Sequence, residues 1–506
     1  MSNTLRRDTR DIGVGAVSIV WTFASAAMTY GIPILFSHSG NSTIAAVQTC
    51  LLVVVLTLVT YLVDPRCYVL YWLSLVLLQN VMAGFWHSGQ ADDIPFVVTE
   101  AKTLSLIAAV SLMGASIARL VRNSPWIGVG AVIYFSSLLL NVSDLSLSML
   151  ANMRNFVAPF LIVLVGIVAA ERFSYCMRIE FVFVLLKFAS FWLFIGAMGE
   201  LIMGTLSWRN AFSVSSIGGL NSLAESTSLF GVSFSRTGGI LFEPVNAGYI
   251  AASVLVVLIV IRYFLRYRAE TLAWVLCFSG ASVALLLAAT KNALLMFAIV
   301  CVIWLFTRYL TGRSGVAVIS AWIMSFLATL LYGTVVKGTG YLAGVWSNPI
   351  GVSGGESTSI HMAGLISGFK GLVSAPFGMG IGSGGNFYRL YNPEISREVW
   401  LGSGSESSWG TLAFQSGFLA ILGFVVLILV LASKGGEATM VLIAVWSGAS
   451  LFTEAFFGPI ACSVLLLAAG LLWRDVGKTR RRSPSHLGVR RDLSPGLVAA
   501  SREQGL

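Results

Sequence analysis

Three basic residues stand in stretches that are otherwise apolar or rich in small residues. Arg236 lies in SFSRTGGILFEPVNAGY, Lys291 in LAATKNALL and Arg154 in NMRNFVAPF. A guanidinium binds phosphate oxygens through paired charge-assisted hydrogen bonds, and an ammonium supplies the same charge from one point. Three such cations that converge from separate helices would suit a diphosphate. For each residue alone, the alternative is a side chain that reaches out to lipid headgroups.

Candidate acids and bases occur in neighbouring stretches. Glu406 lies in GSGSESSWGTL and His361 opens HMAGLISGFKGLV. A carboxylate or a neutral imidazole beside a sugar hydroxyl could take its proton. Glu406 could equally cap the helix that follows it, and His361 could be an inert surface residue. The sequence has no DxD pair or carboxylate cluster, so we predict no metal site.

The elements that must hold these residues are membrane helices. Of the 506 residues, 57% are apolar and 11% are charged, and the mean hydropathy is +0.85, which excludes an ordinary soluble globular protein. The apolar residues form long runs without strand-like alternation, which predicts an all-α polytopic integral membrane protein. Windows of about 20 apolar residues predict about 14 transmembrane helices. We place them at 12–36, 44–63, 67–86, 100–120, 125–142, 155–170, 180–205, 246–266, 271–290, 292–311, 315–336, 408–432, 438–455 and 457–473.

The basic residues indicate the orientation of these helices. Most of the 32 Lys and Arg residues fall in alternate connections and in the C-terminal tail, which marks those parts as cytoplasmic and places both termini there. The net charge of +10 is therefore a topology signal, and we predict no nucleic-acid partner. Residues 1–477 form the predicted transmembrane domain, with long outward loops at 206–245 and 337–407. The second loop is predicted to contain a short helix on the membrane surface at 361–373, and 478–506 a basic, disordered cytoplasmic tail attracted to membrane lipids.

One glycine-rich stretch is a weak match to a nucleotide-binding loop. The sequence GIGSGG fits the GxGxxG pattern through Gly380, Gly382 and Gly385. No strand precedes it and it falls in an outward loop, so we reject a nucleotide site.

Residues 150–425 resemble the O-antigen polymerase and O-antigen ligase superfamily of bacterial membrane proteins. In that family, an arginine-glycine-proline-asparagine stretch opens a central span. The stretch SRTGGILFEPVNAGY is similar to it, through Arg236, Gly239, Pro244 and Asn246. ATKNALL resembles the family's short Ser-Arg turn, with Lys291 in place of arginine. His361 and the later APFGMGIGSG resemble its large periplasmic loop, where a polar or basic residue precedes a Pro-Leu-Phe-Gly-x-Gly-x-Gly run.

The resemblance implies a metal-independent, cofactor-free glycosyltransferase of the bacterial inner (cytoplasmic) membrane. It would polymerise polyprenyl-diphosphate-linked oligosaccharide repeat units for exopolysaccharide, capsule or O-antigen, by inverting transfer on the periplasmic face. Its partner proteins would be a chain-length regulator and a flippase. Arg236, Lys291 and Arg154 would bind the diphosphate. Glu406 or His361 would activate the acceptor hydroxyl, with Glu243 orienting Arg236 and Arg209 in support.

Three other functions stay open. The first is an O-antigen-type ligase, although that branch has a His-Asn pair where this chain has Glu406 and Ser407. The second is a lipid-linked oligosaccharide flippase or transporter, which would need ionisable residues deep in the membrane, where this chain offers Lys187 and little else. The third is a glycosyltransferase that uses a polyprenyl monophosphate, with Asp92 and Asp93 as its carboxylates.

Overall fold

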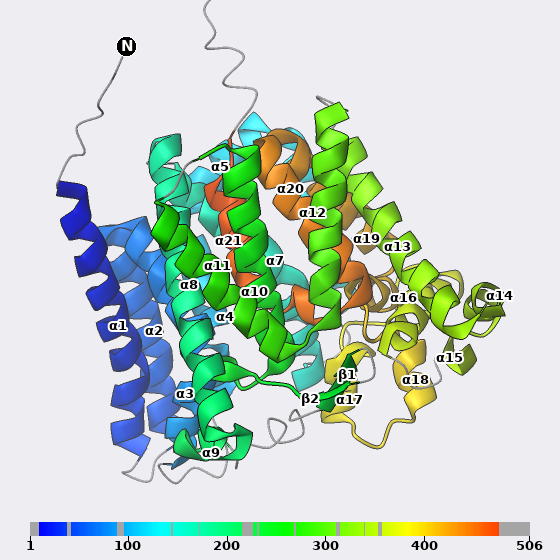
Figure 1. Ribbon diagram of the computed structural model, residues 1–506, viewed down its shortest axis with the longest axis horizontal. Helices are drawn as coiled ribbons and strands as arrows, with labels where there is room; N and C mark the ends of the chain where they lie inside the picture. The colour runs from blue at the N-terminus through cyan, green and yellow to red at the C-terminus, as the bar shows by residue number, and fades with distance from the viewer. Residues whose placement is uncertain are drawn as a thin grey trace, which may run out of the picture.

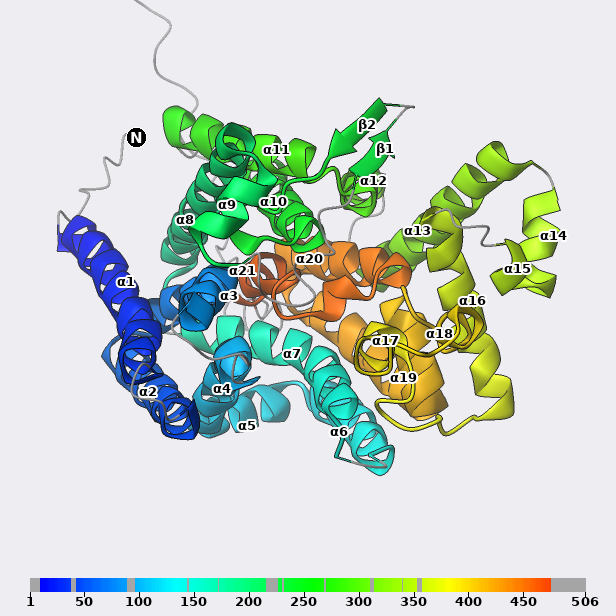
Figure 2. The same ribbon diagram turned by 90° about the horizontal axis from the view of Figure 1, so that it is seen from below.

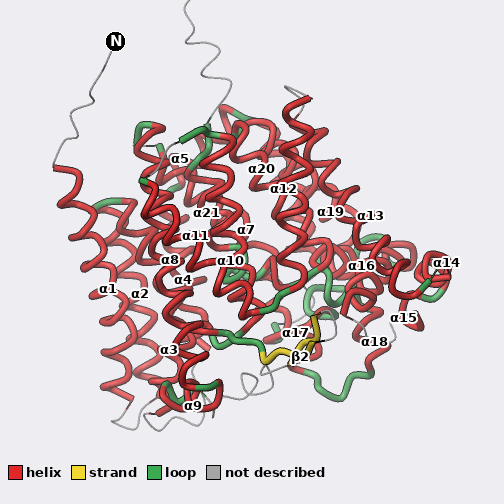
Figure 3. Tube along the Cα trace, in the orientation of Figure 1, coloured by secondary structure: helices red, strands yellow, loops and turns green. Residues whose placement is uncertain are grey.

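The protein is a body of long helices that run side by side between two ends (Figure 1). The computed structural model describes residues 10–37, 42–88, 96–142, 145–171, 173–214, 226–229, 232–267, 270–309, 314–338, 340–352 and 357–474. The predicted tail 478–506 lies outside these residues, as do Asp92 and Asp93. Figure 3 shows most described loops and turns near the two ends and around the glycine-rich segment close to α17.

The helices of the first half, and one short hairpin, precede the central helix α10. They are α1 (Arg10–Ser37), α2 (Ser42–Val63), α3 (Pro65–Ser88), α4 (Phe96–Leu112), α5 (Gly114–Asn123), α6 (Pro125–Leu140), α7 (Leu147–Ala170), α8 (Tyr175–Met203), α9 (Thr205–Ala211), the antiparallel strands β1 (Ser226–Leu229) and β2 (Val232–Ser235), and the 3₁₀ turn η2 (Gly239–Leu241).

The second half begins with α10 and ends with the buried α21. Its helices are α10 (Pro244–Ile259), the π-helical turn η3 (Val260–Phe264), α11 (Thr271–Ala288), α12 (Lys291–Tyr309), α13 (Ser314–Lys337), α14 (Gly340–Ser347), α15 (Pro349–Val352), α16 (Ser357–Ser374), α17 (Gly385–Tyr391), α18 (Arg397–Gly402), α19 (Ser408–Lys434), α20 (Gly436–Ala449), the 3₁₀ turns η4 (Ser450–Phe452) and η5 (Ala455–Phe457), and α21 (Ser463–Leu471).

Within the described residues, eight helices are long and apolar enough to cross a membrane, and a bent pair makes a ninth. Four shorter apolar helices coincide with further predicted spans: Ile19–Leu35, Pro125–Leu140, Leu295–Leu305 and Gly436–Phe452. The predicted span 457–473 contains only the nine residues of α21, which is too short to cross a bilayer at 1.5 Å per residue. The protein is thus a helical membrane protein, and the count of 14 spans is not confirmed.

The predicted span 100–120 is broken rather than continuous. Its two parts, Val98–Leu112 and Gly114–Asn123, meet at an angle of 69°. The second part, α5, is amphipathic, with Leu120 buried and both Arg119 and Arg122 exposed. Such a helix is suited to the membrane interface.

Helices differ strongly in how much of their surface the protein covers. In an 18-residue apolar window of the span Pro244–Phe264, 89% of residues are buried, whereas in the corresponding windows of Thr43–Val63 and Gly315–Val335 only 28% are. The first value identifies α10 as a central helix, and the lower values identify α2 and α13 as peripheral helices with large apolar surfaces for lipid. Figure 2 shows α21 and α20 near the middle of the body, with α1 and α2 at one edge and α13 to α15 at the other.

One end of the body, the upper end in Figure 1, collects basic residues that were predicted to be cytoplasmic. Arg178 donates to the carbonyl of Trp473 at 2.7 Å. Arg119 lies 3.6 Å from Glu171, and its side chain is 61% exposed. These contacts tie helix termini together without burying the charges deeply.

The predicted helix 361–373 exists, and one side of it is packed within the protein. It forms the middle of α16, and its residues from Met362 to Gly368 are buried. A Cβ on Gly364 would collide with the carbonyl oxygen of Ser405, and one on Gly368 with the backbone of Gly410. These small residues let α16 pass close to α19.

The glycine-rich stretch serves packing. α19 is interrupted at Gly417, which has φ +75°, and this break frees backbone groups. Met379 N–H donates to Phe414 O at 2.9 Å and Gly380 N–H to Gln415 O at 3.1 Å. The GIGSGG segment thus satisfies the broken helix, and it needs glycine because Gly380 and its neighbours adopt positive φ.

Candidate functional site

The site forms at the end opposite the basic one, around the loop that joins β2 to α10. The backbone of this loop is held from three helices. Trp208 of α9 donates to Gly239 O at 3.0 Å, and the carboxylate of Glu200 on α8 accepts from Gly239 N at 2.7 Å. Asn80 of α3 donates to Leu241 O at 2.5 Å. The loop is therefore rigidly placed before any side chain of the site is considered.

Arg209 belongs to this support. It is 3% exposed, its Nη2 donates to the carbonyl of Phe242 at 3.1 Å, and Glu200 lies close enough to interact with it electrostatically. Phe242 itself has φ +56°, a conformation that needs such external contacts. Arg209 thus holds the backbone of the loop at the residue before Glu243.

Arg236 bridges the loop and the turn between α11 and α12. Its Nε donates to Ala288 O at 3.0 Å and its Nη2 to the hydroxyl of Thr290 at 3.3 Å. Thr290 in turn donates to Pro244 O at 3.2 Å. The guanidinium is therefore fixed at the start of α10, and it is only partly buried.

Lys291 follows this turn directly and begins α12. Its side chain lies outside the described residues. The proposed contact between Lys291 and a diphosphate therefore stays a prediction, although its backbone position beside Thr290 is adjacent to Arg236.

A cluster of charges lies next to Arg236. Glu243, at the N-cap of α10, interacts electrostatically with Lys102, Arg154 and Arg236. Lys102, only 2% exposed, interacts with Glu100, Arg154 and Glu243. With both carboxylates ionised, three cations and two anions leave one positive charge in excess. Because little solvent screens these buried charges, their excess positive charge attracts an anion more strongly than the same charge would in bulk water.

Arg154 enters this cluster from inside a helix. α7 begins at Leu147, eight residues before the predicted start at 155, because Ser146 caps it and accepts from Met149 N at 3.1 Å. Arg154 pairs with Glu100 of α4, and its guanidinium lies 5.1 Å from the ring centre of Phe387. Arg154 is thus already charge-paired within the protein, unlike the lone cation that the sequence suggested.

Glu406 and His361 form a pair. The Nδ1 of His361 is 2.9 Å from the carbonyl oxygen of Glu406 and 3.4 Å from its carboxylate oxygen Oε2. The side chains are 13% and 27% exposed, respectively. The sequence left open which of the two is the base. The structure brings the two side chains together, and which of them is the base stays open.

Glu406 does not cap α19. Ser407 is the N-cap, and its hydroxyl accepts from Gly410 N at 3.0 Å. The hydroxyls of Ser403 and Ser405 both donate to Trp400 O, at 2.7 and 2.6 Å. These serines are buried and hold the turn. The side chain of Glu406, in the same turn, stays partly exposed. Glu406 itself adopts φ +67°, a strained conformation of the kind found at functional sites.

Tyr249 connects the two groups of residues. Its hydroxyl lies beside Asn292 and Thr453, and it interacts electrostatically with both Glu406 and Arg236. Its ring stacks on Phe456 at 5.0 Å. Electrostatic interactions therefore relate Glu243 to Arg236 and Arg154. Tyr249 relates Arg236 to Glu406, the partner of His361.

Sequence reasoning did not assign four residues to this site. Lys102 and Glu100 share the polar stretch TEAKT at the start of an apolar helix, and that polarity was the available signal. Tyr249 gave no signal, because tyrosines are common in membrane helices. Glu454, discussed below, fell inside a predicted span, where a lone carboxylate deserves a functional explanation.

Among the described residues, no three His, Cys, Asp or Glu side chains lie close enough together to hold a metal ion. The cations of the cluster are suited to anionic oxygens, and the His361 and Glu406 pair is suited to removing a proton.

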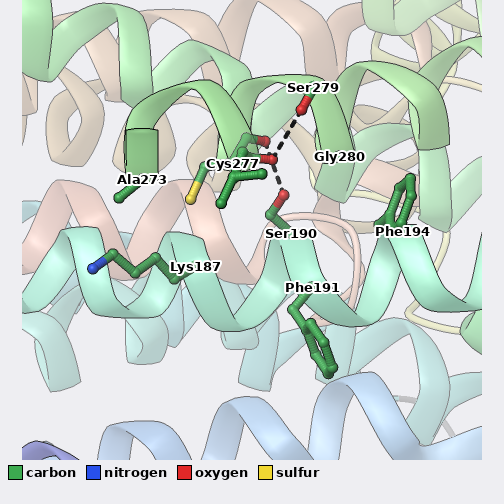
Figure 4. Close-up of a pocket in the computed structure, with 9 residues that line it drawn as sticks. Lys187, Ser190, Phe191, Phe194, Ala273, Cys277, Ser279 and Gly280 are labelled. Carbon is green, nitrogen blue, oxygen red and sulfur yellow. Dashed lines mark hydrogen bonds between the residues drawn. The ribbon is translucent and has the colours of Figure 1, made fainter. Parts of the chain in front are cut away.

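A separate groove lies between α8 and α11 and has a volume of about 430 Å³. It is lined by Lys187, Ser190, Phe191, Phe194, Ala273, Leu276, Cys277, Ser279 and Gly280. Figure 4 shows Ser190 hydrogen-bonded to α11, where its hydroxyl donates to Cys277 O at 2.8 Å. Lys187 extends away from Ser190 along α8. The Lys187 ammonium lies 5.1 Å from the ring centre of Phe183, and Phe191 is 57% exposed. The groove therefore faces lipid.

No protein-family model, curated protein or solved structure matches this chain.

Proposed function

We propose that this protein is a membrane glycosyltransferase that polymerises polyprenyl-diphosphate-linked oligosaccharide repeat units. The observation that carries the proposal is the His361 and Glu406 pair, a potential base, linked through Tyr249 to Arg236. A proton acceptor and a fixed cation at the same end of the helices are what transfer from a diphosphate requires. The resemblance of residues 150–425 to O-antigen polymerases supports the same function.

In the proposed reaction, Glu406 accepts the proton of the acceptor hydroxyl while His361 holds the carboxylate in place. The acceptor oxygen bonds to the anomeric carbon of the donor sugar, and the bond from that carbon to the diphosphate oxygen breaks. The electron pair leaves with the diphosphate. Attack from the face opposite the leaving group inverts the anomeric configuration.

Arg236 would stabilise the charge that grows on the diphosphate, together with Lys291 and the excess positive charge of the cluster. A cation fixed by Ala288 O and Thr290 needs little reorganisation as the charge develops, which is the basis of electrostatic catalysis. Glu243 orients the loop cations, and Arg209 supports their loop from below.

We infer the orientation from the basic end. With Arg66, Arg119, Arg178 and Arg474 on the cytoplasmic side, the site opens on the periplasmic side of a bacterial inner membrane. Polymerisation there would take repeat units delivered by a flippase, under the control of a chain-length regulator.

The test is reconstitution of the purified protein in lipid nanodiscs with polyprenyl-diphosphate-linked repeat units and EDTA. We expect a ladder of products on a gel. Transfer that occurs only after a lipid A core acceptor is added would identify a ligase instead. No product in either case, with movement of a fluorescent lipid-linked sugar across liposomes, would identify a flippase.

The position of Lys187 weighs against transport. This mid-span cation rests against Phe183 at the lipid-facing groove, whereas transporters usually place such residues on a path through the protein. The ionisable groups of the site lie instead at one end of the helices.

A further inference from the structure

Glu454 is a buried carboxyl in the break between η4 and η5, outside the apolar helices. It is 5% exposed. Its Oε2 accepts a hydrogen bond from the backbone N–H of Asn386 at 2.8 Å. Its Oε1 is buried and has no hydrogen-bond partner among the described residues. A buried carboxyl is costly to keep, so its presence calls for a reason.

One side of Glu454 contacts the start of α17. Asn386, which donates to Glu454, also accepts from Trp400 Nε1 at 3.0 Å. The next residue, Phe387, lies under the guanidinium of Arg154 at 5.1 Å. Glu454 thus helps to fix the aromatic ring on which a cation of the site rests.

The other side of Glu454 contacts the turn that carries Glu406. Ser408, two residues after Glu406, donates to Thr453 O at 2.6 Å and lies 3.3 Å from Glu454 O. The backbone N–H of Glu406 also interacts with the Glu454 carboxyl. One residue therefore joins the turn of Glu406 to the segment beside Arg154.

The fit around Glu454 is close. A Cβ on Gly385 would lie 2.6 Å from its Oε1, and Gly385 has φ +81°. Only glycine therefore allows the carboxyl to sit against the start of α17.

We propose that Glu454 is a positioning residue that holds the Glu406 carboxylate in its reactive place by joining the Glu406 turn to the start of α17. The inference rests on the proposed function, because it assumes that Glu406 is the base.

The protonation state of Glu454 fits this role. Burial raises the pKa of the Glu454 carboxyl to about 8, and the negative charge of Glu406 adds to the rise. Among the described residues, Glu406 is the charged group that acts on it; its other neighbours are backbone N–H groups and the side chains named above. At neutral pH the acid is uncharged, so it places no second negative charge beside the base. Above pH 8 its ionisation would make Glu406 harder to keep in place and would repel the diphosphate.

The experiment compares wild type, Glu454→Gln and Glu454→Ala as full-length proteins in nanodiscs, in the ladder assay from pH 6 to 9. Glutamine keeps the acceptor for Asn386 N–H and is always neutral. We therefore expect E454Q to match wild type near pH 7 and to keep its rate above pH 8, where wild type slows. We expect E454A to lose about 10²-fold in kcat, the effect of misplacing a catalytic group by about 1 Å. Glu270→Gln, an exposed glutamate at the opposite end, is the control.

Two results would overturn the inference: an E454A enzyme with wild-type rate and pH profile, or an E454Q enzyme as inactive at pH 7 as Glu406→Gln. Infrared spectroscopy of the same samples does not depend on activity. It compares wild type with E454Q, so it remains informative if E454A fails to fold. Wild type should show a protonated carboxyl band that fades as pH rises through about 8 and is missing from E454Q. The absence of this band would refute the inference even if the ladder forms, whereas the band without any ladder would refute only the polymerase.

Discussion

The two ends of the helical body treat charge in opposite ways. At the basic end, Arg119 is 61% exposed and Arg178 ends on a backbone carbonyl. At the site end, the side chain of Arg154 is 15% exposed and Lys102 is 2% exposed. Exposed pairs contribute about 0–1 kcal/mol to stability, whereas buried charges cost several kcal/mol unless they are paired. The exposed charges of the basic end fit a topology signal, whereas the buried charges of the site end depend on pairing with Glu100 and Glu243.

The sharpest expected difference concerns the carboxylate. Glu406→Gln removes the proton acceptor but keeps the shape of the side chain and its neighbour His361. We expect about 10²- to 10⁴-fold slower polymer formation, the usual contribution of a general base, measured as the initial rate of repeat-unit consumption. Glu270→Gln at the basic end should match wild type. Equal rates for E406Q and wild type would remove Glu406 from the reaction.

The next largest effect should come from the cation Arg236 at the site end, compared with Arg178 at the basic end. Arg236→Ala should cost about 10²- to 10³-fold in kcat, because it removes charge stabilisation that acts mainly in the transition state. Arg236→Lys should recover part of this loss, since it restores the charge without the paired geometry. Arg178→Ala at the basic end is the matched control. If R178A slowed turnover as much as R236A, the two ends would not differ as we describe.

Adding a methyl group at a close helix contact should affect stability and turnover at the site, whereas the same change at an open position should affect neither. Gly364→Ala places a Cβ against the carbonyl oxygen of Ser405, in the turn that carries Glu406. We expect a loss of about 1–3 kcal/mol in stability, typical of overpacking, together with slower turnover. Gly340→Ala, where a Cβ meets nothing within 4 Å, is the control in thermal unfolding. A fully stable and active G364A would show that the close contact of α16 and α19 does not matter.

The smallest effect should come from a surface pair of the basic end. Arg119→Ala removes the 3.6 Å contact with Glu171 and should change stability by about 0–1 kcal/mol, with turnover unchanged. Thermal unfolding at low and high salt measures it. A loss of stability above this range would mean that the exposed charges contribute substantially to folding.

The sequence predicts the apolar helices, whereas the contacts among the candidate site residues cannot be predicted from it. Apolar windows locate most membrane helices, because burial in lipid constrains them locally. The site depends on contacts across the chain: His361 and Glu406 are 45 residues apart, and no local pattern reveals their pairing. Glu454 resembled part of a span because its neighbours are apolar.

The same limit applies to packing. The helix at 361–373 could be predicted, but its close contact with α19 could not, because its glycines mark a crossing point only once α19 is known to pass there. The start of α7 was placed too late, because the polar residues around Arg154 hid a helix whose polar face is buried in the protein.

The most direct measurement is the ladder assay with wild type, Glu406→Gln, Arg236→Ala and Arg178→Ala reconstituted side by side at equal protein and with EDTA. We predict a ladder from wild type and R178A, and a near-complete loss from E406Q and R236A. A ladder of equal length and yield from all four proteins would contradict the assignment of the reaction to the Glu406 and Arg236 end.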